Sequence, residues 1–311
     1  MTASKVQFVE IDEGSHGQRL DNFLIKILKG APKSLIYRII RKGEVRINRG
    51  RAKPETKLKI GDMVRVPPVR LDQKVTEHKP SSGLLSVLDN AVVYESDQLL
   101  IVNKPSGLAV HGGSGVNLGL IEALRARPDA PRYLELVHRL DKETSGCVMI
   151  AKKRSMLTYL QDLLRQEGRI NKRYLALVQG QWSKRKTLVN APLYKHEAAG
   201  GERRVTVDHN KGKPSKTQFK LLDSFEGCSL VEAKPLTGRT HQIRVHALHE
   251  KHALVGDDKY GDPEFNAKLK RRGIRRLFLH AFALDLTLPD GRKLSVEAPL
   301  PAELKQGLSR L

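Results

Sequence analysis

The first residue whose surroundings suggest chemistry is a single carboxylate set among basic side chains. Asp141 lies within Val-His-Arg-Leu-Asp-Lys-Glu-Thr-Ser-Gly at 137–146, after a strand-like Leu136-Val137 and before a small Thr-Ser-Gly step. We therefore expect a loop to present it. A loop-borne carboxylate amid Arg and Lys suits chemistry at a sugar carbon inside an anionic substrate. A structural ion pair or a helix cap would explain the same residue equally well.

Several other kinds of active site are disfavoured by the residues nearby. Glu143 is the nearest second carboxylate, but its spacing from Asp141 in a loop fits a glycosidase pair poorly. No Ser-His-Asp spacing is readable, and Ser106 in Lys-Pro-Ser-Gly does not form a nucleophile elbow. The glycine-rich stretch at 111–115 lacks the Gly-Lys-Ser/Thr ending of a phosphate-binding loop.

The composition indicates a polyanionic partner. The 311 residues include 56 Lys and Arg against 34 Asp and Glu, a net charge of +22. Such an excess favours nucleic acid, because each phosphate contact releases counterions and adds affinity. No apolar run approaches the roughly 18 residues of a membrane span, and no signal peptide is visible at the start. The two cysteines, Cys147 and Cys228, predict neither a disulfide framework nor a cysteine-rich zinc site. We expect a cytoplasmic protein.

The front of the chain carries half of this charge. Residues 18–70 hold 15 Lys or Arg and 4 Asp or Glu. Apolar residues at helical spacing predict two short helices, over 20–28 and 35–40, followed by short strands near 45–48 and 63–66. This order resembles the S4-like RNA-binding domain, with basic residues crowded around the helix–strand junction: Arg38, Arg41, Lys42, Arg46, Arg49 and Arg51. A merely solvated basic face is the alternative.

The remaining elements predict an α+β architecture. A polar stretch over 71–83, with Pro, Ser and Gly together, is typical of a flexible linker. Beyond it, strands and helices mix without regular βαβ alternation, and residues 282–288 alternate into a Pro-Asp-Gly turn that predicts a hairpin. We therefore expect an RNA-binding domain over 1–70 with its core at 18–70, a linker over 71–83, and a domain around a mostly antiparallel sheet over 84–311.

Taken together, the motifs resemble those of the RluA family of pseudouridine synthases. The first is the Asp141 segment, and the second is Leu-Thr-Gly-Arg-Thr-His-Gln-Ile-Arg-Val-His at 236–246. Three shorter ones are Val-Asn-Lys-Pro-Ser-Gly at 102–107, Lys-Arg-Tyr-Leu-Ala-Leu-Val at 172–178 and Arg-Leu-Phe-Leu-His-Ala at 276–281. With the S4-like segment in front, the resemblance covers nearly the whole chain. It implies a catalytic domain with its active site in a cleft across the sheet.

The resemblance also implies an activity and roles for individual residues. The activity is isomerisation of uridines in large-subunit ribosomal RNA, with Asp141 as the catalytic carboxylate, acting as a nucleophile at the sugar carbon or as a base on its 2′ position. Arg239 would pair with Asp141 and keep it ionised. Tyr174 would stack on the uracil and take the proton from carbon 5. Arg139 would fill the space that the flipped nucleotide leaves, and Leu279 would pack against the base. No cofactor or metal is needed.

A histidine cluster offers a competing interpretation. His241, His246, His249 and His252 are expected on one helix, which is a pattern that a zinc site can use. The spacing is not His-Glu-x-x-His, no cysteine joins it, and two of the four belong to the family motif. We therefore expect solvated or RNA-facing imidazoles.

Two other functions remain open. A non-catalytic RNA-binding or ribosome-assembly factor could share the fold, and an RNA glycosylase would release free uracil. The expected partner is large-subunit ribosomal RNA, with no membrane and no obligate protein partner, and the protein is expected to be a monomer.

Overall fold

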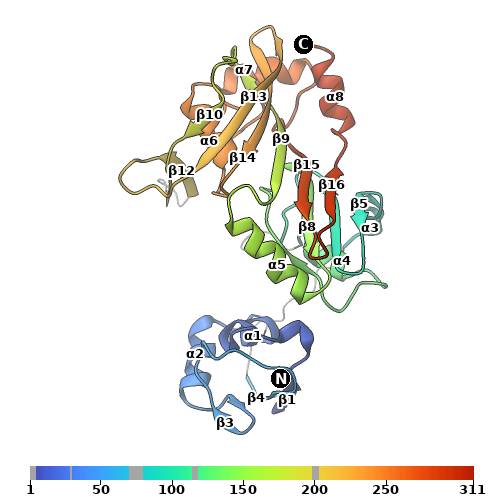
Figure 1. Ribbon diagram of the computed structural model, residues 1–311, viewed down its shortest axis with the longest axis vertical. Helices are drawn as coiled ribbons and strands as arrows, with labels where there is room; N and C mark the ends of the chain where they lie inside the picture. The colour runs from blue at the N-terminus through green and yellow to red at the C-terminus, as the bar shows by residue number, and fades with distance from the viewer. Residues whose placement is uncertain (1–4, 29, 70–79, 114–117, 198–202) are drawn as a thin grey trace. The chain divides into compact units, whose positions relative to one another are not determined.

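The computed structural model describes residues 5–28, 30–69, 80–113, 118–197 and 203–311. The chain divides into two compact units, Met1–His78 and Lys79–Leu311 (Figure 1). Most of the expected linker, 71–79, lies outside the described residues. Its end was predicted wrongly, because helix α3 (Ser82–Asp89) begins inside it. The Ser81 hydroxyl accepts the Leu84 N–H and so caps that helix.

The N-terminal unit packs two helices on a small antiparallel sheet. Helix α1 (Leu20–Ile27) and helix α2 (Lys33–Arg41) bury apolar residues at helical spacing against the sheet. The sheet has the order β1-β4-β2-β3: β1 (Gln7–Glu10), β4 (Met63–Val66), β2 (Arg46–Ile47) and β3 (Gly50–Arg51). Asn48 and Arg49 adopt left-handed backbone angles between β2 and β3. The turn of that hairpin therefore lies at these two residues. Strand β1 had no clear signal in the sequence.

The C-terminal unit is built on one twisted sheet, ten-stranded among the described residues. Its main order is β10-β13-β14-β9-β15-β8-β6-β5, with β16 on β15 and β7 on β8. All of these pairs are antiparallel except β15 with β8. The strands are β5 (Val92–Glu95), β6 (Leu99–Lys104), β7 (Glu135–Leu136), β8 (Ser145–Ala151), β9 (Asn171–Gln179), β10 (Leu188–Asn190), β13 (Lys216–Phe225), β14 (Cys228–Pro235), β15 (Leu279–Thr287) and β16 (Lys293–Glu297).

Helices cover both faces of this sheet. Side chains along its inner strands are therefore buried on both sides. Helix α5 (Arg154–Arg165) packs on one face of β6 and β8, while α3 and α4 (Leu120–Arg125) pack on the other. Helix α6 (Gln242–His249) lies against β9, β13 and β14. Helices α7 (Pro263–Arg271) and α8 (Ala302–Leu308) complete a further cluster beside β9 and β14. A separate hairpin joins β11 (Leu193–Glu197) to β12 (Arg203–Val207).

The two halves of the sheet meet at β15. Two loops, one from each half, define the functional region. The loop of residues 138–144 arrives from the β8 half, whereas the loop 236–241 arrives from the β14 half and leads into α6. The expected α+β class with a mostly antiparallel sheet is confirmed.

Candidate active site

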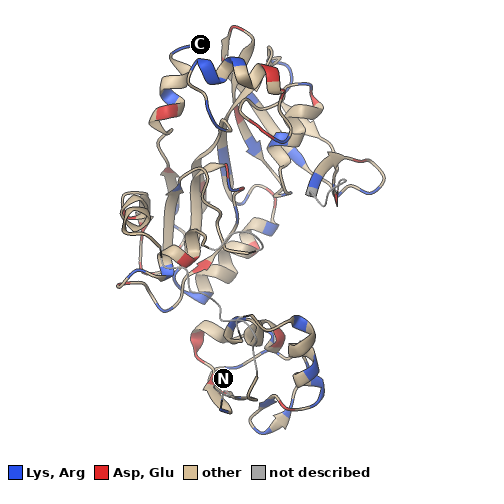
Figure 2. Cartoon of the chain, turned by 180° about the vertical axis from the view of Figure 1, so that it is seen from behind, with Lys and Arg blue, Asp and Glu red and all other residues tan. Residues whose placement is uncertain are grey.

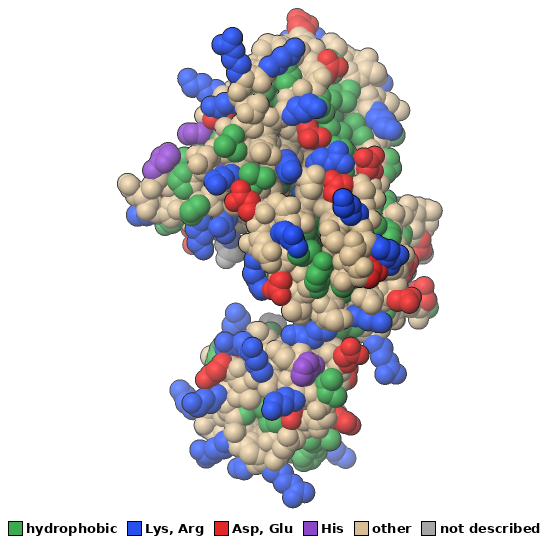
Figure 3. Space-filling view, in the orientation of Figure 1, with side chains coloured by type: hydrophobic (Ala, Val, Ile, Leu, Met, Phe, Trp, Pro, Cys, Tyr) green, Lys and Arg blue, Asp and Glu red, His purple; other side chains and the backbone are tan. Residues whose placement is uncertain are grey.

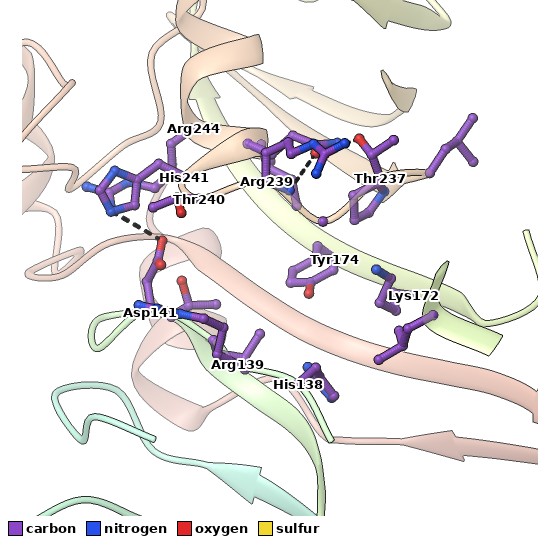
Figure 4. A pocket seen from close by; sticks show the side chains of 18 of the residues that line it. His138, Arg139, Asp141, Lys172, Tyr174, Thr237, Arg239, Thr240, His241 and Arg244 are labelled. Atoms are coloured by element: carbon purple, nitrogen blue, oxygen red, sulfur yellow. Dashed lines mark hydrogen bonds and ion pairs between the residues drawn. The ribbon is translucent and has the colours of Figure 1, made fainter. Parts of the chain in front are cut away.

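A cleft of about 580 Å³ opens between these two loops. One wall is the loop that carries Asp141, and the other is the segment from Pro235 to the first turn of α6. Strands β9 and β15 supply the floor through Lys172, Tyr174 and Leu279. Figure 4 shows Asp141 at one end, facing His241 and Arg244, with Tyr174 between Asp141 and Lys172.

Asp141 is held by an arginine that is itself fixed. Arg244 donates from Nη1 to Asp141 Oδ2 at 3.4 Å. Its Nε and Nη2 each donate to Asp257 at 2.7 Å, and Asp257 also accepts the N–H groups of Lys259 and Tyr260. Burial lowers the pKa of Arg244, but the hydrogen bonds and charges of Asp257 and Asp141 outweigh it and leave the pKa raised. The guanidinium is therefore a permanent, oriented cation beside Asp141.

His241 completes this end of the cleft through an unusual backbone. It has φ 53° at the N-cap of α6, a left-handed conformation that turns the chain into the helix. Its Nδ1 lies 2.7 Å from the Tyr260 hydroxyl, and its Nε2 lies 3.9 Å from Asp141 Oδ2. Burial lowers the pKa of His241, although the charge of Asp141 opposes this. The imidazole thus borders the carboxylate beside Arg244.

The wall that holds Arg244 is anchored by buried polar side chains. Gln242 accepts hydrogen bonds from the Thr237 hydroxyl and the Arg239 N–H, and donates to the Lys216 carbonyl and the Thr217 hydroxyl. One turn later, His246 contacts Thr217, Ser215 and the Ala191 carbonyl. Since buried polar groups must find partners, these bonds fix the position of α6 on the sheet.

The opposite wall is tied down by a fully buried lysine. Lys104 donates from Nζ to the carbonyls of Pro105, Leu108 and Lys142 at 2.7–3.0 Å. The Gly107 N–H also donates to Lys142, and Ser106 donates to Glu143. Burial lowers the pKa of Lys104 to about 7, although Glu143 and Asp141 oppose this effect. The Lys-Pro-Ser-Gly segment therefore holds the Asp141 loop through the backbone carbonyls of the two residues that follow Asp141.

The floor presents an aromatic ring to the cleft. Tyr174 is 8% exposed, and burial, with a smaller contribution from the charge of Asp141, raises the pKa of its phenol. The phenol is therefore neutral at physiological pH, with a flat face suited to a nucleobase. Leu279 is 4% exposed and lies on the neighbouring strand β15, where it packs with Tyr174 in the same core cluster.

Comparison with known proteins agrees with this geometry. The family described as RNA pseudouridylate synthase matches residues 98–249, and the S4 domain matches residues 18–64. The chain is 53% identical to "Ribosomal large subunit pseudouridine synthase C" of Yersinia pestis over 98% of this chain and 96% of that protein. The protein of the same name from Escherichia coli (strain K12) is 51% identical, covering 98% of this chain and 97% of the relative. This chain belongs to the RNA pseudouridylate synthase family.

A solved structure supports the same assignment for the catalytic unit. The structure titled "Human RNA Pseudouridylate Synthase Domain Containing 4" superposes with a TM-score of 0.59 at 28% identity, covering 73% of this chain and 95% of that one. The expected enzyme class, an RNA pseudouridine synthase with an S4 domain in front, is confirmed.

One expected contact of the synthase was wrong. Arg239 was expected to pair with Asp141, but its Nε donates to the Pro214 carbonyl at 3.2 Å, and Arg244 makes the ion pair. The reason is local: the left-handed turn at His241 redirects the chain, so α6 carries Arg244 inward while Arg239 stays exposed at the rim. Arg139 is also exposed and lines the cleft on the Asp141 side.

The four histidines of the synthase do not share one helix, contrary to expectation. Helix α6 spans Gln242–His249, so His241 precedes it and His252 follows a left-handed turn at Lys251. His241 contacts the Tyr260 hydroxyl, and His246 contacts the Thr217 hydroxyl on strand β13. His252 lies 2.7 Å from the Gln179 carbonyl. The side chains of His241, His246 and His252 therefore contact three different parts of the fold.

The six basic residues singled out in the S4 domain are all exposed. Among the residues that the structure describes, none of the six is in an ion pair with a carboxylate. Figure 3 shows Lys and Arg side chains over much of one face of this unit, and Figure 2 marks Lys and Arg positions along its backbone. The group therefore presents uncompensated positive charge to solvent, as an RNA-binding face requires.

Sequence reasoning missed three residues of the site. Arg244 stands in the motif at 236–246 but received no role, and its burial at 8% exposure is the property that marks it. Asp257 is 1% exposed and far along the chain, and no local pattern connects it to Arg244. Lys172 opens the motif at 172–178, two residues before Tyr174. The strand period of two could have placed it on the same face.

Proposed function

We propose that this synthase converts uridines of large-subunit ribosomal RNA to pseudouridine, with Asp141 as the catalytic carboxylate. The observation that carries the proposal is the contact between Asp141 and Arg244 at the end of a cleft floored by Tyr174. The relatives at about half identity, named for the large ribosomal subunit, support the substrate class. No helix in the described part of the chain is long and apolar enough to cross a membrane.

The reaction begins with access to the base. A uridine within folded RNA must leave its stack, which costs a few kcal/mol. Arg139, exposed at the rim, is positioned to occupy the vacated space. The uracil then lies over the neutral Tyr174 ring, and Leu279 packs beside it. Stacking on an aromatic side chain offsets part of the unstacking cost.

Asp141 then acts at the ribose. Arg244 favours the ionised carboxylate and directs it into the cleft, while Asp257 prevents Arg244 from turning away. Two routes fit: attack of Asp141 on carbon 1′, or removal of the 2′ proton. In both, the bond from carbon 1′ to N1 breaks and the base rotates. Carbon 5 then bonds to carbon 1′, as Asp141 leaves carbon 1′ in the first route or returns the proton to carbon 2′ in the second. Carbon 5 loses its proton and N1 gains one. The raised pKa of Tyr174 favours stacking as its main role, because a neutral phenol is a weak base.

Replacement of the carboxylate tests the proposal. Asp141→Asn should lower the single-turnover rate by at least about 10⁴-fold, as removal of a covalent or proton-transfer group does. RNA affinity should remain nearly unchanged, since Asp141 contributes no favourable contact to phosphates. Pseudouridine formation by the D141N protein at a tenth of the normal rate would exclude Asp141 as the catalytic residue.

Product analysis separates an isomerase from a glycosylase. An isomerase retains the base, so no free uracil should accumulate while pseudouridine appears in the RNA. Stoichiometric free uracil would instead establish glycosidic hydrolysis. Pseudouridine-specific sequencing of ribosomal RNA from a deletion strain identifies the sites.

A further inference from the structure

Lys172 is a cation inside the cleft with no acidic partner among the residues that the structure describes. It is half-buried on the floor strand β9 and lines the cavity. In the described part of the chain its ammonium has no hydrogen-bond or ion-pair partner. Burial alone lowers its pKa, with no opposing carboxylate. An ammonium that is partly removed from water and has no partner is unfavourable. We therefore expect the substrate to supply a hydrogen-bond acceptor for Lys172.

The adjacent residue shows what the same strand does with a structural cation. Arg173 projects to the opposite face, where it lies within 3.5–3.9 Å of Glu232, Asp285 and Glu297 and over the Phe282 ring. Three carboxylates thus lie close to Arg173, which faces away from the cleft. The lysine that faces into it has none among the described residues.

Two nearby side chains, His138 and Glu167, do not act as partners for the Lys172 ammonium. His138 lines the same part of the cleft, but its Nε2 already accepts the Met149 N–H. Burial, with a smaller effect from Lys172 itself, lowers the pKa of His138 to about 4, so the ring is neutral. Glu167 on the rim lies 4.0 Å from Lys216 instead.

The position of Lys172 relative to Tyr174 and Asp141 suggests which substrate atom it meets. Lys172 and Tyr174 share a strand face at a separation of ~6.6 Å along the strand. Asp141 lies on the other side of the Tyr174 ring, and the nitrogen of Lys172 is turned toward that ring (Figure 4). A uracil stacked on Tyr174 with its sugar at Asp141 therefore directs its far edge toward Lys172.

The chemistry of uracil gives this far edge a constant identity. In uridine the sugar is on N1, and the ring atom opposite N1 is C4, which bears O4. In pseudouridine the sugar is on C5, and the atom opposite C5 is C2, which bears O2. A carbonyl oxygen therefore occupies the same place before and after the base rotates.

We propose that the Lys172 ammonium donates a hydrogen bond to the uracil carbonyl opposite the glycosidic bond, O4 in the substrate and O2 in the product. This inference rests on the proposed function. When the bond from carbon 1′ to N1 breaks, its electron pair stays on the base and spreads over N1, O2 and O4. C5 then donates an electron pair to carbon 1′, and the proton that leaves C5 is balanced by one gained at N1. Lys172 keeps its proton throughout and stabilises the anionic base between the two bonds.

A phosphate is the other anionic group that Lys172 could meet. The depth of the side chain argues against it, because phosphates stay at the mouth of a cleft that admits a flipped base. The exposed Arg139 and Arg239 already provide guanidinium groups at that rim. The two contacts differ in how binding depends on O4 and on salt.

A binding cycle tests the contact at one atom. In an Asp141→Asn background, which arrests turnover, RNA with uridine at the target is compared with RNA carrying pyrimidin-2-one riboside, which lacks O4. With Lys172 present, removal of O4 should weaken binding about 10- to 100-fold, as for a charged hydrogen bond. In the Lys172→Met protein the uridine RNA should bind as weakly as the analogue, and the analogue should weaken no further. Pseudouridine formation by the D141N protein would contradict the proposed function separately.

Rates complete the test in the otherwise unaltered enzyme. Lys172→Met should lower the saturating single-turnover rate by about 10²–10³-fold, because the developing anion is no longer stabilised. Arg173→Gln, which removes the cation on the other face of β9, should leave the rate and the O4 dependence unchanged. Additive effects in the cycle, or an unchanged rate, would overturn the proposal. So would an effect confined to affinity with a salt slope lower by about one, which indicates a phosphate contact. If Lys172→Met failed to fold, equal binding of the two RNAs by the protein that retains Lys172 would overturn it alone.

Discussion

Arg244 shows how one buried residue can prepare a carboxylate before the substrate arrives. Two of its nitrogens are occupied by Asp257, and the third points to Asp141. The Arg244 guanidinium also lies 5.0 Å from the centre of the Tyr260 ring, which restricts it further. Because this cation is oriented in the free enzyme, little reorganisation is needed when the ribose binds.

The two arginines at the cleft should differ in their effect on catalysis. Arg244→Lys should lower kcat by about 10²–10³-fold, since a single ammonium cannot serve Asp257 in two places and reach Asp141. Arg239→Lys should leave kcat nearly unchanged and affect mainly RNA affinity. Steady-state kinetics on both variants measures this. An equal fall of kcat in the R239K variant would mean that Arg239 reaches Asp141 in the RNA complex.

A buried histidine predicts how the stability of the fold depends on pH. His280 is fully buried, accepts from Ser145 at Nδ1 and donates from Nε2 to the Ala298 carbonyl. Burial lowers its pKa to about 4, below the unfolded value of about 6.5. Between these values only the unfolded state takes a proton. The contribution is therefore present above about pH 6.5 and disappears as the pH falls toward about 4.

Urea unfolding measures this effect directly. The free energy of unfolding should drop between about pH 7 and about pH 5, and the drop should be smaller in His280→Gln. An identical pH dependence in both proteins would mean that the pKa of His280 is the same in the folded and the unfolded state.

At the scale of elements, the seam between β8 and β15 supports the Asp141 loop. Only two residue pairs form this parallel contact, His280 with Ser145 and Ala281 with Gly146. Gly146 has φ 112°, and a Cβ there would lie 2.2 Å from the Ala281 carbonyl oxygen. The glycine therefore permits the close approach of β15 just after the loop that carries Asp141.

Alanine substitution separates this packing effect from backbone strain. Gly146→Ala should cost about 3 kcal/mol or more in unfolding free energy, because the backbone of β15 must shift. Gly291→Ala is the matched control: it also has positive φ, 86°, but nothing lies within 4 Å of its Cβ position. It should cost only about 1 kcal/mol. Denaturation of both variants measures the two losses of unfolding free energy. Equal losses would mean that the positive φ alone determines the cost.

Local elements were predictable from the sequence, whereas their pairing was not. The alternation at 282–288 and the Pro-Asp-Gly turn predicted the hairpin of β15 and β16 correctly. The apolar spacing of 20–28 likewise predicted α1. Nothing local shows that β15 inserts between β9 and β8, because that position depends on long-range packing. The same limit explains Arg239: one left-handed residue, His241, decides which arginine faces Asp141.

At the scale of the molecule, the two units have separate cores. Among the described residues, the buried apolar cluster of the N-terminal unit consists of residues up to Val69, and the clusters of the C-terminal unit begin at Leu84. Each unit therefore has the apolar burial that folding requires.

Deletion of residues 1–79 tests the division of labour between them. The remaining chain keeps the Ser81 cap of α3, so it should fold and still isomerise a short, accessible RNA, but slowly. Its affinity for long ribosomal RNA should fall, and the slope of log Kd against log salt should shrink by roughly one for each phosphate that the S4 domain no longer neutralises. Binding at several salt concentrations measures this. Equal slopes for both proteins would mean that the basic face is only solvated.

The place of β15 has a consequence for how the chain emerges from the ribosome. This strand lies in the middle of the sheet, yet about 130 residues separate its start at Leu279 from the end of β8 at Ala151. At about 5–20 residues per second, β8 waits roughly 6–26 seconds for its neighbour to be synthesised. During that time the start of β8, Ser145 and Gly146, lacks its β15 partner, and this short stretch of edge is open to chaperones or to wrong pairing. Catalytic competence must then arise abruptly, near the end of translation, when the last third of the polypeptide closes the sheet.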